Sequence, residues 1–234
     1  MSASIQPITI YGHKGRAPNP PKVHILLDLL NIPWTLVELE MKHDPTDEKS
    51  IKHPSYLAVN PNGRIPAIVD PNQNNIAVWE SAAILQYITE VYDTTHKFSG
   101  KTLEERTLIN EWIAFQISGQ GPIQGQIFWF SFDRFHKEKY GEAAPPHVVQ
   151  RFRDEIHRVC GVVEGQLARQ KAKGSDWIAC DRMTIADIAW YPWSRANAFA
   201  GIDMEEFPNL KAWVDRMGEV PAVKHVYETV AGES

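Results

Sequence analysis

The sequence predicts a protein of two domains, an α/β domain followed by an all-helical one. Three patterns support this: a strand–helix–strand pattern at residues 8–39, a hairpin followed by a helix at residues 67–92, and almost entirely helical periodicity after residue 100. A polar, turn-rich stretch separates the two parts. We therefore expect domains at residues 1–93 and 101–234, joined by a linker at residues 94–100.

The first domain begins with a strand at residues 8–11 and a helix that opens at Pro20 and Pro21. Proline lacks an N–H and has a fixed φ, so it fits the first turn of a helix but not its interior. One face of this helix is apolar and the other polar, which predicts a half-buried helix. The apolar face carries Leu26, Leu27 and Leu30, and the polar face carries Lys22, Asp28 and Asn31. Residues 34–39 read as a second strand.

Residues 59–81 form the central stretch of this domain. Asn-Pro and Asn-Gly pairs at residues 60–63 indicate a loop, and the apolar run 67–69 is short enough to be a buried strand. Pro66 cannot donate a hydrogen bond, so it belongs at the beginning of that strand. A polar turn returns the chain into residues 76–78, and an amphipathic helix follows Glu80 and Ser81. The resulting order, βαβ then ββα, is that of a thioredoxin-like domain.

The second half shows helical periodicity almost throughout. We expect a long helix from about residue 103, interrupted by glycines and a proline between Gly119 and Gly125 and resuming toward Phe132. Thr184 and Asp187 have the spacing of a capping box, which predicts another helix start. These two residues are expected to have a structural role, because they satisfy helix-start N–H groups.

Composition excludes several classes of function. The chain has 234 residues and a net charge of −5 without a basic cluster, which argues against a nucleic-acid partner. Neither a signal-peptide core nor an apolar run of membrane-spanning length occurs. The two cysteines, Cys160 and Cys180, have no metal or redox spacing, and the nine histidines form no metal pattern. We expect a cytoplasmic protein that binds no metal and no membrane.

The stretch around Pro66 and Ser81 combines two binding features. A loop before a strand that begins with proline exposes backbone groups that could pair with an extended peptide. The start of a helix at Ser81 offers N–H groups and a hydroxyl for a carboxylate, and Glu80 would suit an ammonium. A small peptide with an amino-acid head would fit these groups. The alternative is that Glu80 and Ser81 only cap the helix and Pro66 only shapes a turn.

These residues resemble a known family. Asn-Pro-Asn-Gly-Arg-Ile-Pro-Ala-Ile-Val-Asp, followed by Glu-Ser at a helix start, is similar to the glutathione-binding half of cytosolic glutathione transferases, and the helical half resembles theirs as well. The resemblance implies the glutathione transferase fold, with glutathione as co-substrate. It also implies a cis proline at Pro66, pairing of Ile65 with the cysteinyl backbone of glutathione, and binding of the γ-glutamyl group by Glu80 and Ser81.

The chain has no cysteine at the beginning of its first helix, where a thioredoxin-like redox protein would carry one. Sulfur chemistry here requires a thiol that arrives with the ligand, and glutathione supplies one. An alkyl thiol has a pKa of about 8.5, which a helix N-terminus and an amide hydrogen bond both lower. Asn19, directly before Pro20, is placed to provide the amide. The alternative is that Asn19 only caps the helix.

Two groups within the family have an asparagine at this place. They are the bacterial nu class and the fungal class that resembles the yeast nitrogen-catabolite regulator. The resemblance assigns the contact with the glutathione sulfur to Asn19, and a contact with a second glutathione or glutathione disulfide to Arg151. Many nu-class members carry a threonine where this chain has Ala17, which lacks a hydroxyl. For the glycyl carboxylate, Lys52 and His53 are both candidates.

The sequence thus leads to one main hypothesis and two alternatives. The main hypothesis is a homodimeric glutathione transferase whose bound thiolate attacks a hydrophobic electrophile or a disulfide, with a second-substrate pocket in the helical domain. The first alternative is a glutathione-binding regulator or ligand carrier with little turnover. The yeast regulator depends on a disordered Asn/Gln-rich tail, and only about seven residues precede Ile8 here. The second alternative, a translation-factor-type scaffold, would need an appended module.

Overall fold

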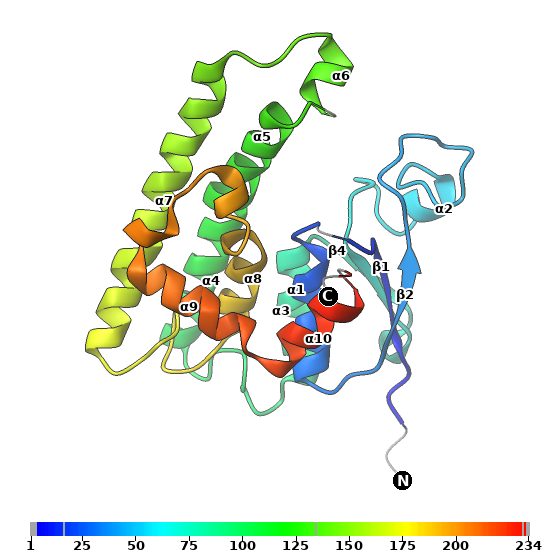
Figure 1. Ribbon diagram of the computed structural model, residues 1–234. Helices are drawn as coiled ribbons and strands as arrows, with labels where there is room; N and C mark the ends of the chain where they lie inside the picture. Colours follow the sequence, from blue (N-terminus) through cyan, green and yellow to red (C-terminus); the bar gives the residue numbers. More distant parts are fainter. Residues whose placement is uncertain (1–3, 16, 134, 231, 233–234) are drawn as a thin grey trace. The chain divides into compact units, whose positions relative to one another are not determined.

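The computed structural model describes residues 4–15, 17–133, 135–230 and 232, so the outermost ends of both expected domains lie outside the described residues. Contacts divide the chain into two compact units (Figure 1). The N-terminal unit comprises the residues up to Phe98 and those from Glu219 onward, and the helical unit comprises Ser99–Gly218. The last helix, which we expected in the helical domain, therefore belongs by its contacts to the N-terminal unit.

The N-terminal unit is built on one mixed sheet, which confirms the predicted thioredoxin-like order. The strand order is β2-β1-β3-β4. β1 pairs in parallel with β2, and β3 pairs antiparallel with both β1 and β4. The bounds are β1 Ile8–Gly12, β2 Trp34–Glu38, β3 Ala67–Asp70 and β4 Ile76–Trp79. Pro66 stands directly before β3, as its missing N–H requires.

Four helices complete the N-terminal unit: α1 Pro20–Leu29, α2 Pro54–Leu57, α3 Ser81–Tyr92 and α10 Pro221–Thr229. Both α3 and α10 pack against α1. Leu26 and Leu27 on the apolar face of α1 are buried as predicted, and Leu30 is half-buried. The polar assignment of Lys22 is wrong, because only 1% of this residue is exposed. Because α3 and α10 cover α1 on two sides, little of its first turns is exposed to solvent.

The helical unit contains α4 Leu103–Phe115, α5 Gly121–Ser131, α6 His136–Tyr140, α7 Pro146–Ala172, α8 Ile185–Ser194 and α9 Pro208–Gly218. The expected interruption between Gly119 and Gly125 is not a break. A π-helical turn at Gln116–Gln120 joins α4 directly to α5. The turn accommodates one bulge in the hydrogen-bond ladder without leaving helical backbone geometry.

The predicted capping box is present at the beginning of α8. The Thr184 side chain accepts a backbone hydrogen bond, and the Asp187 carboxylate accepts the N–H of Thr184 at 2.9 Å. Asp187 is fully buried and also accepts hydrogen bonds from the Ile178 N–H and the Trp213 indole, each at 3.0 Å. Four donors thus converge on one carboxylate, which connects α8 to α9 and to the loop before α8.

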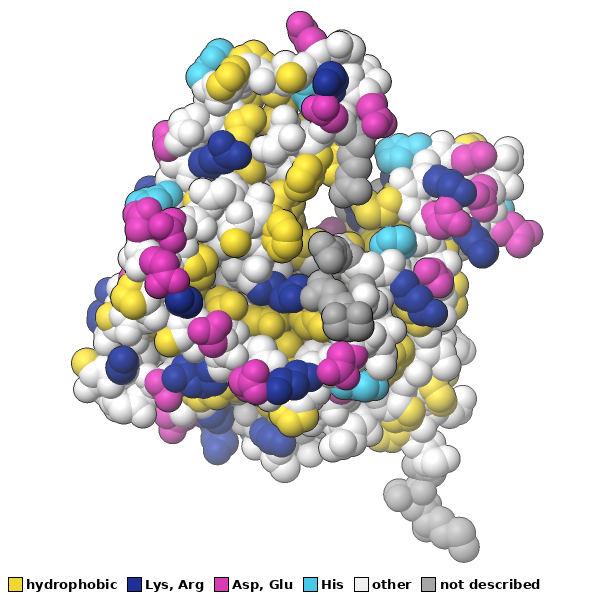
Figure 2. All heavy atoms as spheres, in the orientation of Figure 1, with side chains coloured by type: hydrophobic (Ala, Val, Ile, Leu, Met, Phe, Trp, Pro, Cys, Tyr) yellow, Lys and Arg dark blue, Asp and Glu magenta, His cyan; other side chains and the backbone are white. Residues whose placement is uncertain are grey.

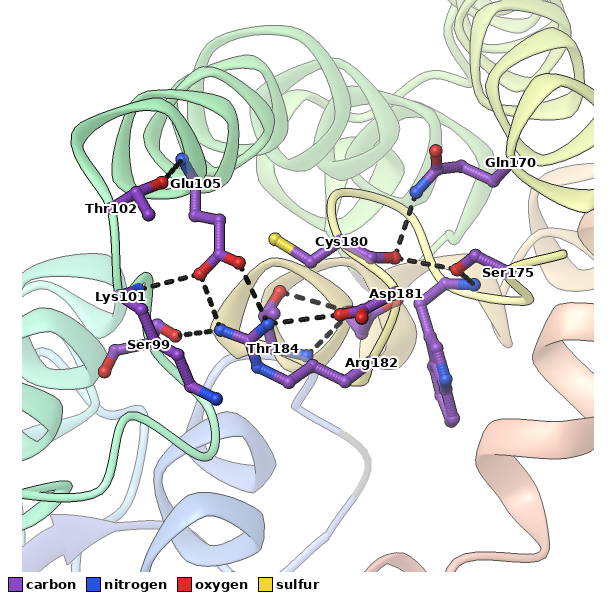
Figure 3. A network of polar contacts seen from close by, with 12 residues as sticks. Ser99, Lys101, Thr102, Glu105, Gln170, Ser175, Cys180, Asp181, Arg182 and Thr184 are labelled. Carbon is purple, nitrogen blue, oxygen red and sulfur yellow. Dashed lines mark hydrogen bonds and ion pairs between the residues drawn. The ribbon is translucent and has the colours of Figure 1, made fainter. Parts of the chain in front are cut away.

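A second polar network joins the loop before α8 to the first turn of α4 (Figure 3). The Arg182 guanidinium donates to the Glu105 carboxylate and to the Ser99 carbonyl, both at 2.8 Å. The Lys101 N–H donates to the same Glu105 carboxylate at 2.7 Å. Hydrogen bonds from Arg182, followed by that of Lys101, lower the pKa of Glu105 to about 2.

Aromatic side chains concentrate on α5. Phe128 stacks on both Phe132 and Trp193, and Trp129 stacks on Phe135. Figure 2 shows hydrophobic side chains reaching the surface along this helix, and 39% of Phe132 is exposed. No helix of the described residues has the length and apolar character needed to cross a membrane.

Candidate functional site

The site begins where α1 begins. Asn19 is the N-cap residue of α1, with Pro20 and Pro21 in the first two helical positions. Its carbonyl accepts the Lys22 N–H at 3.3 Å. The Asn19 side chain makes no capping hydrogen bond, so the capping alternative for this side chain is not supported. The amide is half-buried at the positive end of α1, where it can serve an incoming anion.

The loop before β3 holds the backbone of Ile65 in a fixed place. The Ile65–Pro66 peptide bond is cis, as the resemblance implies. The carbonyl of the preceding Arg64 accepts two hydrogen bonds, from the Tyr56 hydroxyl at 2.5 Å and the Asn60 amide at 2.6 Å. Within the described part of the chain, the Ile65 backbone makes no hydrogen bond of its own. Its N–H and C=O can therefore pair with an extended peptide.

Helix α3 begins at Ser81, directly after a strained residue. Glu80 has φ +70°, a region that non-glycine residues seldom adopt and that costs roughly 1–3 kcal/mol. Its carboxylate is exposed and accepts a hydrogen bond from the Asn62 amide at 3.4 Å. Ser81 is 7% exposed and occupies the first helical position. The predicted pair thus has a buried hydroxyl at a helix start and an exposed carboxylate beside it.

Lys22 is the residue that sequence reasoning missed. Its ammonium lies 3.4 Å from the Ser81 hydroxyl, so it connects the beginning of α1 with that of α3. Burial lowers the pKa of Lys22 to about 7, and the nearby Glu80 carboxylate opposes this shift. The pattern of polar residues on α1 placed Lys22 on the exposed face, and no sequence motif indicated its contact with Ser81.

Lys52 and His53 lie close together in sequence but have different roles. The Lys52 ammonium donates to the carbonyls of Asn62 and Gly63, both at 3.1 Å. The His53 side chain instead caps α2 by accepting the Ser55 N–H at 3.3 Å. Lys52 is therefore connected to the loop before Ile65, and His53 is connected to α2.

These contacts form a continuous path through the N-terminal unit. Lys52 contacts Asn62, Asn62 contacts Glu80, and Glu80 is followed by Ser81, which accepts from Lys22. The Lys22 N–H then donates to Asn19, as described above. The path connects Lys52, Glu80, Ser81 and Asn19, whereas His53, Ile65 and Pro66 make none of these contacts. Arg151 lies on α7 in the helical unit and is exposed, so it is not part of this path.

The arrangement suits a zwitterionic peptide. It contains two helix starts and two ammonium groups for carboxylates, one exposed carboxylate for an ammonium, and one unpaired backbone segment. Among the described residues, no group of three or more His, Cys, Asp or Glu side chains is arranged to hold a metal ion.

Comparison with known proteins identifies the family. Residues 18–91 match the model of the glutathione S-transferase N-terminal domain, and residues 126–221 match that of the C-terminal domain. The chain is 41% identical to the glutathione S-transferase-like protein tpcF of Aspergillus fumigatus over 231 residues, which cover 94% of each protein.

Two solved structures share the whole fold. The glutathione transferase URE2P6 from Phanerochaete chrysosporium, in complex with oxidized glutathione, is 37% identical with a TM-score of 0.83 and full coverage of both chains. Ure2p in complex with glutathione is 32% identical with a TM-score of 0.84, covering 97% of this chain and 96% of that one. By sequence and by fold, the chain belongs to the glutathione S-transferase family, among its members that resemble Ure2.

Proposed function

We propose that this transferase binds glutathione on its N-terminal unit and uses the glutathione thiolate to attack an electrophilic carbon or a disulfide sulfur. The observation that carries the proposal is the chain of contacts that joins Lys52 to Glu80 through Asn62, and Ser81 to Asn19 through Lys22. Beside it stands the Ile65 backbone, which makes no hydrogen bond of its own within the described residues. Glu80 receives the γ-glutamyl ammonium and Ser81 its carboxylate. The Ile65 backbone and Pro66 receive the cysteinyl part of the peptide.

The thiolate is stabilised at the beginning of α1. A free thiol is mostly protonated at neutral pH, and each unit by which its pKa falls requires roughly 1.4 kcal/mol of preference for the thiolate. The Asn19 amide and the N-terminus of α1 supply this preference. Ala17 contributes no hydroxyl, so Asn19 carries most of the activation.

The two ends of glutathione have separate partners. Lys52 receives the glycyl carboxylate, because its ammonium has three donors and the carbonyls of Asn62 and Gly63 use two. His53 is the weaker candidate, because its ring already caps α2. Arg151, exposed on α7, receives a second glutathione or one half of glutathione disulfide. The complex of URE2P6 with oxidized glutathione supports such a ligand.

The second substrate is a hydrophobic electrophile or a disulfide, held by aromatic side chains of the helical unit. The stacked rings of Phe128 on α5 and Phe132 directly after it are suited to an apolar compound. The protein acts as a homodimer in the cytoplasm. Two buried, unpaired cysteines, Cys160 and Cys180, support a reducing compartment.

The test measures turnover with glutathione, using a model aryl halide in one assay and hydroxyethyl disulfide in the other. We expect Asn19→Ala to lower kcat by about 10- to 100-fold, the value of a charge-assisted hydrogen bond of about 1.5–3 kcal/mol. Gln73→Ala, which changes an exposed residue of the same unit, is the matched control. Full activity of Asn19→Ala in both assays would remove the assigned catalytic group.

The same assays separate transfer from simple binding. Ure2p, a relative of this chain, binds glutathione in its solved complex, and a regulator or carrier would retain glutathione without turnover in either assay. A faster disulfide reaction would identify a glutathione-dependent reductase. The head-group site is tested by Glu80→Gln combined with Ser81→Ala, which we expect to abolish retention on immobilised glutathione. Unchanged retention would show that the head group binds elsewhere.

A further inference from the structure

Lys22 is a buried cation in an unfavourable place. It is 1% exposed and stands third in α1, and no acidic residue occupies the first turn of that helix. A positive charge at a helix N-terminus opposes the helix dipole, and burial removes its hydration. An apolar side chain of similar length would avoid both costs. The position therefore favours a role for the charge itself.

The groups around Lys22 indicate what that role is. Its ammonium contacts the Ser81 hydroxyl at 3.4 Å, and Glu80 is the charged group whose field acts on it. On α10, the other helix that packs against α1, the buried titratable residue is Tyr227. His225 of α10 contacts Asp28, near the far end of α1. Among the described neighbours named here, Glu80, itself assigned to a ligand ammonium, is the carboxylate whose field acts on Lys22.

We propose that Lys22 is a positioning residue of the glutathione site, which holds the Ser81 hydroxyl and supplies positive charge for the γ-glutamyl carboxylate, so that binding is coupled to uptake of a proton. This inference rests on the proposed glutathione site. Lys22 acts through Ser81, because the ammonium is almost completely covered by protein.

The coupling between binding and proton uptake follows from the protonation state of Lys22 in the ligand-free protein. Burial lowers its pKa to about 7, so it is only partly protonated at neutral pH. A carboxylate bound at Ser81 lies one hydrogen bond from the Lys22 ammonium, so it favours the charged form and raises this pKa. The ligand ammonium opposes this effect by pairing with Glu80, but the exposed Glu80 carboxylate is screened by water, so the carboxylate at Ser81 has the larger effect. Affinity is then greatest below pH 7 and falls as the pH rises through the pKa of the complex. An increase of about one in the Lys22 pKa would weaken binding roughly sevenfold between pH 6 and 8.5.

The first measurement uses the wild-type protein. Calorimetric titrations with S-methylglutathione, which has no ionisable thiol, are carried out at pH 7.5 in phosphate and in Tris, two buffers with different ionisation enthalpies. We expect uptake of about half a proton for each ligand bound, which follows from the same increase in pKa. Binding without uptake would overturn the inference and leave the proposed function standing. Failure to bind either S-methylglutathione or glutathione would overturn both.

Two variants assign the proton. Lys22→Met should bind several-fold more weakly than the wild type at pH 6, and Lys22→Arg should bind tightly at pH 6. In both variants, affinity should fall less between pH 6 and 8.5 than in the wild type. The part of the fall that comes from Lys22 disappears, because arginine stays charged and methionine has no charge. Titration of the ligand amine is common to all the proteins. Lys14→Met is the control, since it removes an exposed positive charge from the same unit.

Folding of each variant is checked by circular dichroism and thermal unfolding. If Lys22→Met does not fold, proton uptake by the wild type and the profile of Lys22→Arg decide the question. Lys22 would have only a structural role if the glutathione affinity of either folded variant depended on pH as it does in the wild type. Loss of proton uptake in Lys14→Met would assign the proton to the general charge of the unit and overturn the role of Lys22.

Discussion

Replacing Glu105 by glutamine tests the network that holds the beginning of α4 to the loop before α8. The Glu105 carboxylate accepts hydrogen bonds from two nitrogens of Arg182 and from the Lys101 N–H. Glutamine keeps the shape of the side chain but removes the charge and offers one acceptor oxygen instead of two. We expect Glu105→Gln to unfold more easily than the wild type at neutral pH.

The magnitude follows from the pKa of Glu105. The difference between 4.5 and about 2 corresponds to about 3 kcal/mol in favour of the ionised form. About a quarter of each side chain, 24% for Arg182 and 27% for Glu105, remains exposed. Screening by water reduces the expected contribution to about 1–2 kcal/mol. Because the folded-state pKa is depressed, this stability is complete above pH 4.5 and disappears as the pH falls toward 2.

The assay is urea unfolding of the wild type, Glu105→Gln, Arg182→Met and the double variant, at pH 7 and pH 3 and at one protein concentration. The double-mutant cycle isolates the coupling between the two side chains. We expect coupling of about 1–2 kcal/mol at pH 7 and less at pH 3. Coupling that is the same at both pH values, or below about 0.3 kcal/mol at pH 7, would refute the electrostatic reasoning.

Three further predictions concern stability and binding. Asp187→Ala leaves several buried donors without an acceptor and should destabilise the helical unit by about 3–5 kcal/mol, measured by urea unfolding; a loss below 1 kcal/mol would contradict this. Tyr92→Phe removes a 2.6 Å hydrogen bond to the buried Asp70 carboxylate and should lower the free energy of unfolding by about 1–2 kcal/mol at pH 7. An unchanged free energy of unfolding would show that the other donors to Asp70 are sufficient to stabilise the carboxylate. Gly63→Ala places a Cβ atom 2.7 Å from both the Ile51 carbonyl oxygen and the Lys52 ammonium, in a left-handed backbone. The backbone carbonyl cannot yield as the lysine can, so the loop that holds Lys52 should shift and glutathione affinity measured by calorimetry should fall; wild-type affinity would argue against Lys52 as a ligand.

Local signals in the sequence predicted most of the N-terminal unit. Proline at helix and strand starts and the Asn-Gly loop define where elements begin and end, independently of tertiary contacts. The pair Glu80 and Ser81 was found for the same reason, because a helix start is a local feature. The capping box of Thr184 and Asp187 is equally local, and it is present in the structure.

Features that depend on contacts distant in sequence were not predicted. Burial of Lys22 results from the packing of α3 and α10 against α1, which periodicity on α1 alone does not reveal. The glycine-rich stretch after Phe115 was expected to break the helix, but the surrounding helices keep it helical as a π turn. Helix α2 has only four residues, too few for a periodic pattern. In the first two cases tertiary packing decides against the local preference.

The association of α10 with α1 affects the order in which the chain can fold during synthesis. Val223, Val226 and Tyr227 are buried in α10, although the ribosome makes them after the whole helical unit. The helical unit is contiguous and can complete its core while α10 is still inside the exit tunnel. The first-made unit therefore finishes folding last, and a fragment that ends at Phe98 would leave the α10-facing side of α1 open to water.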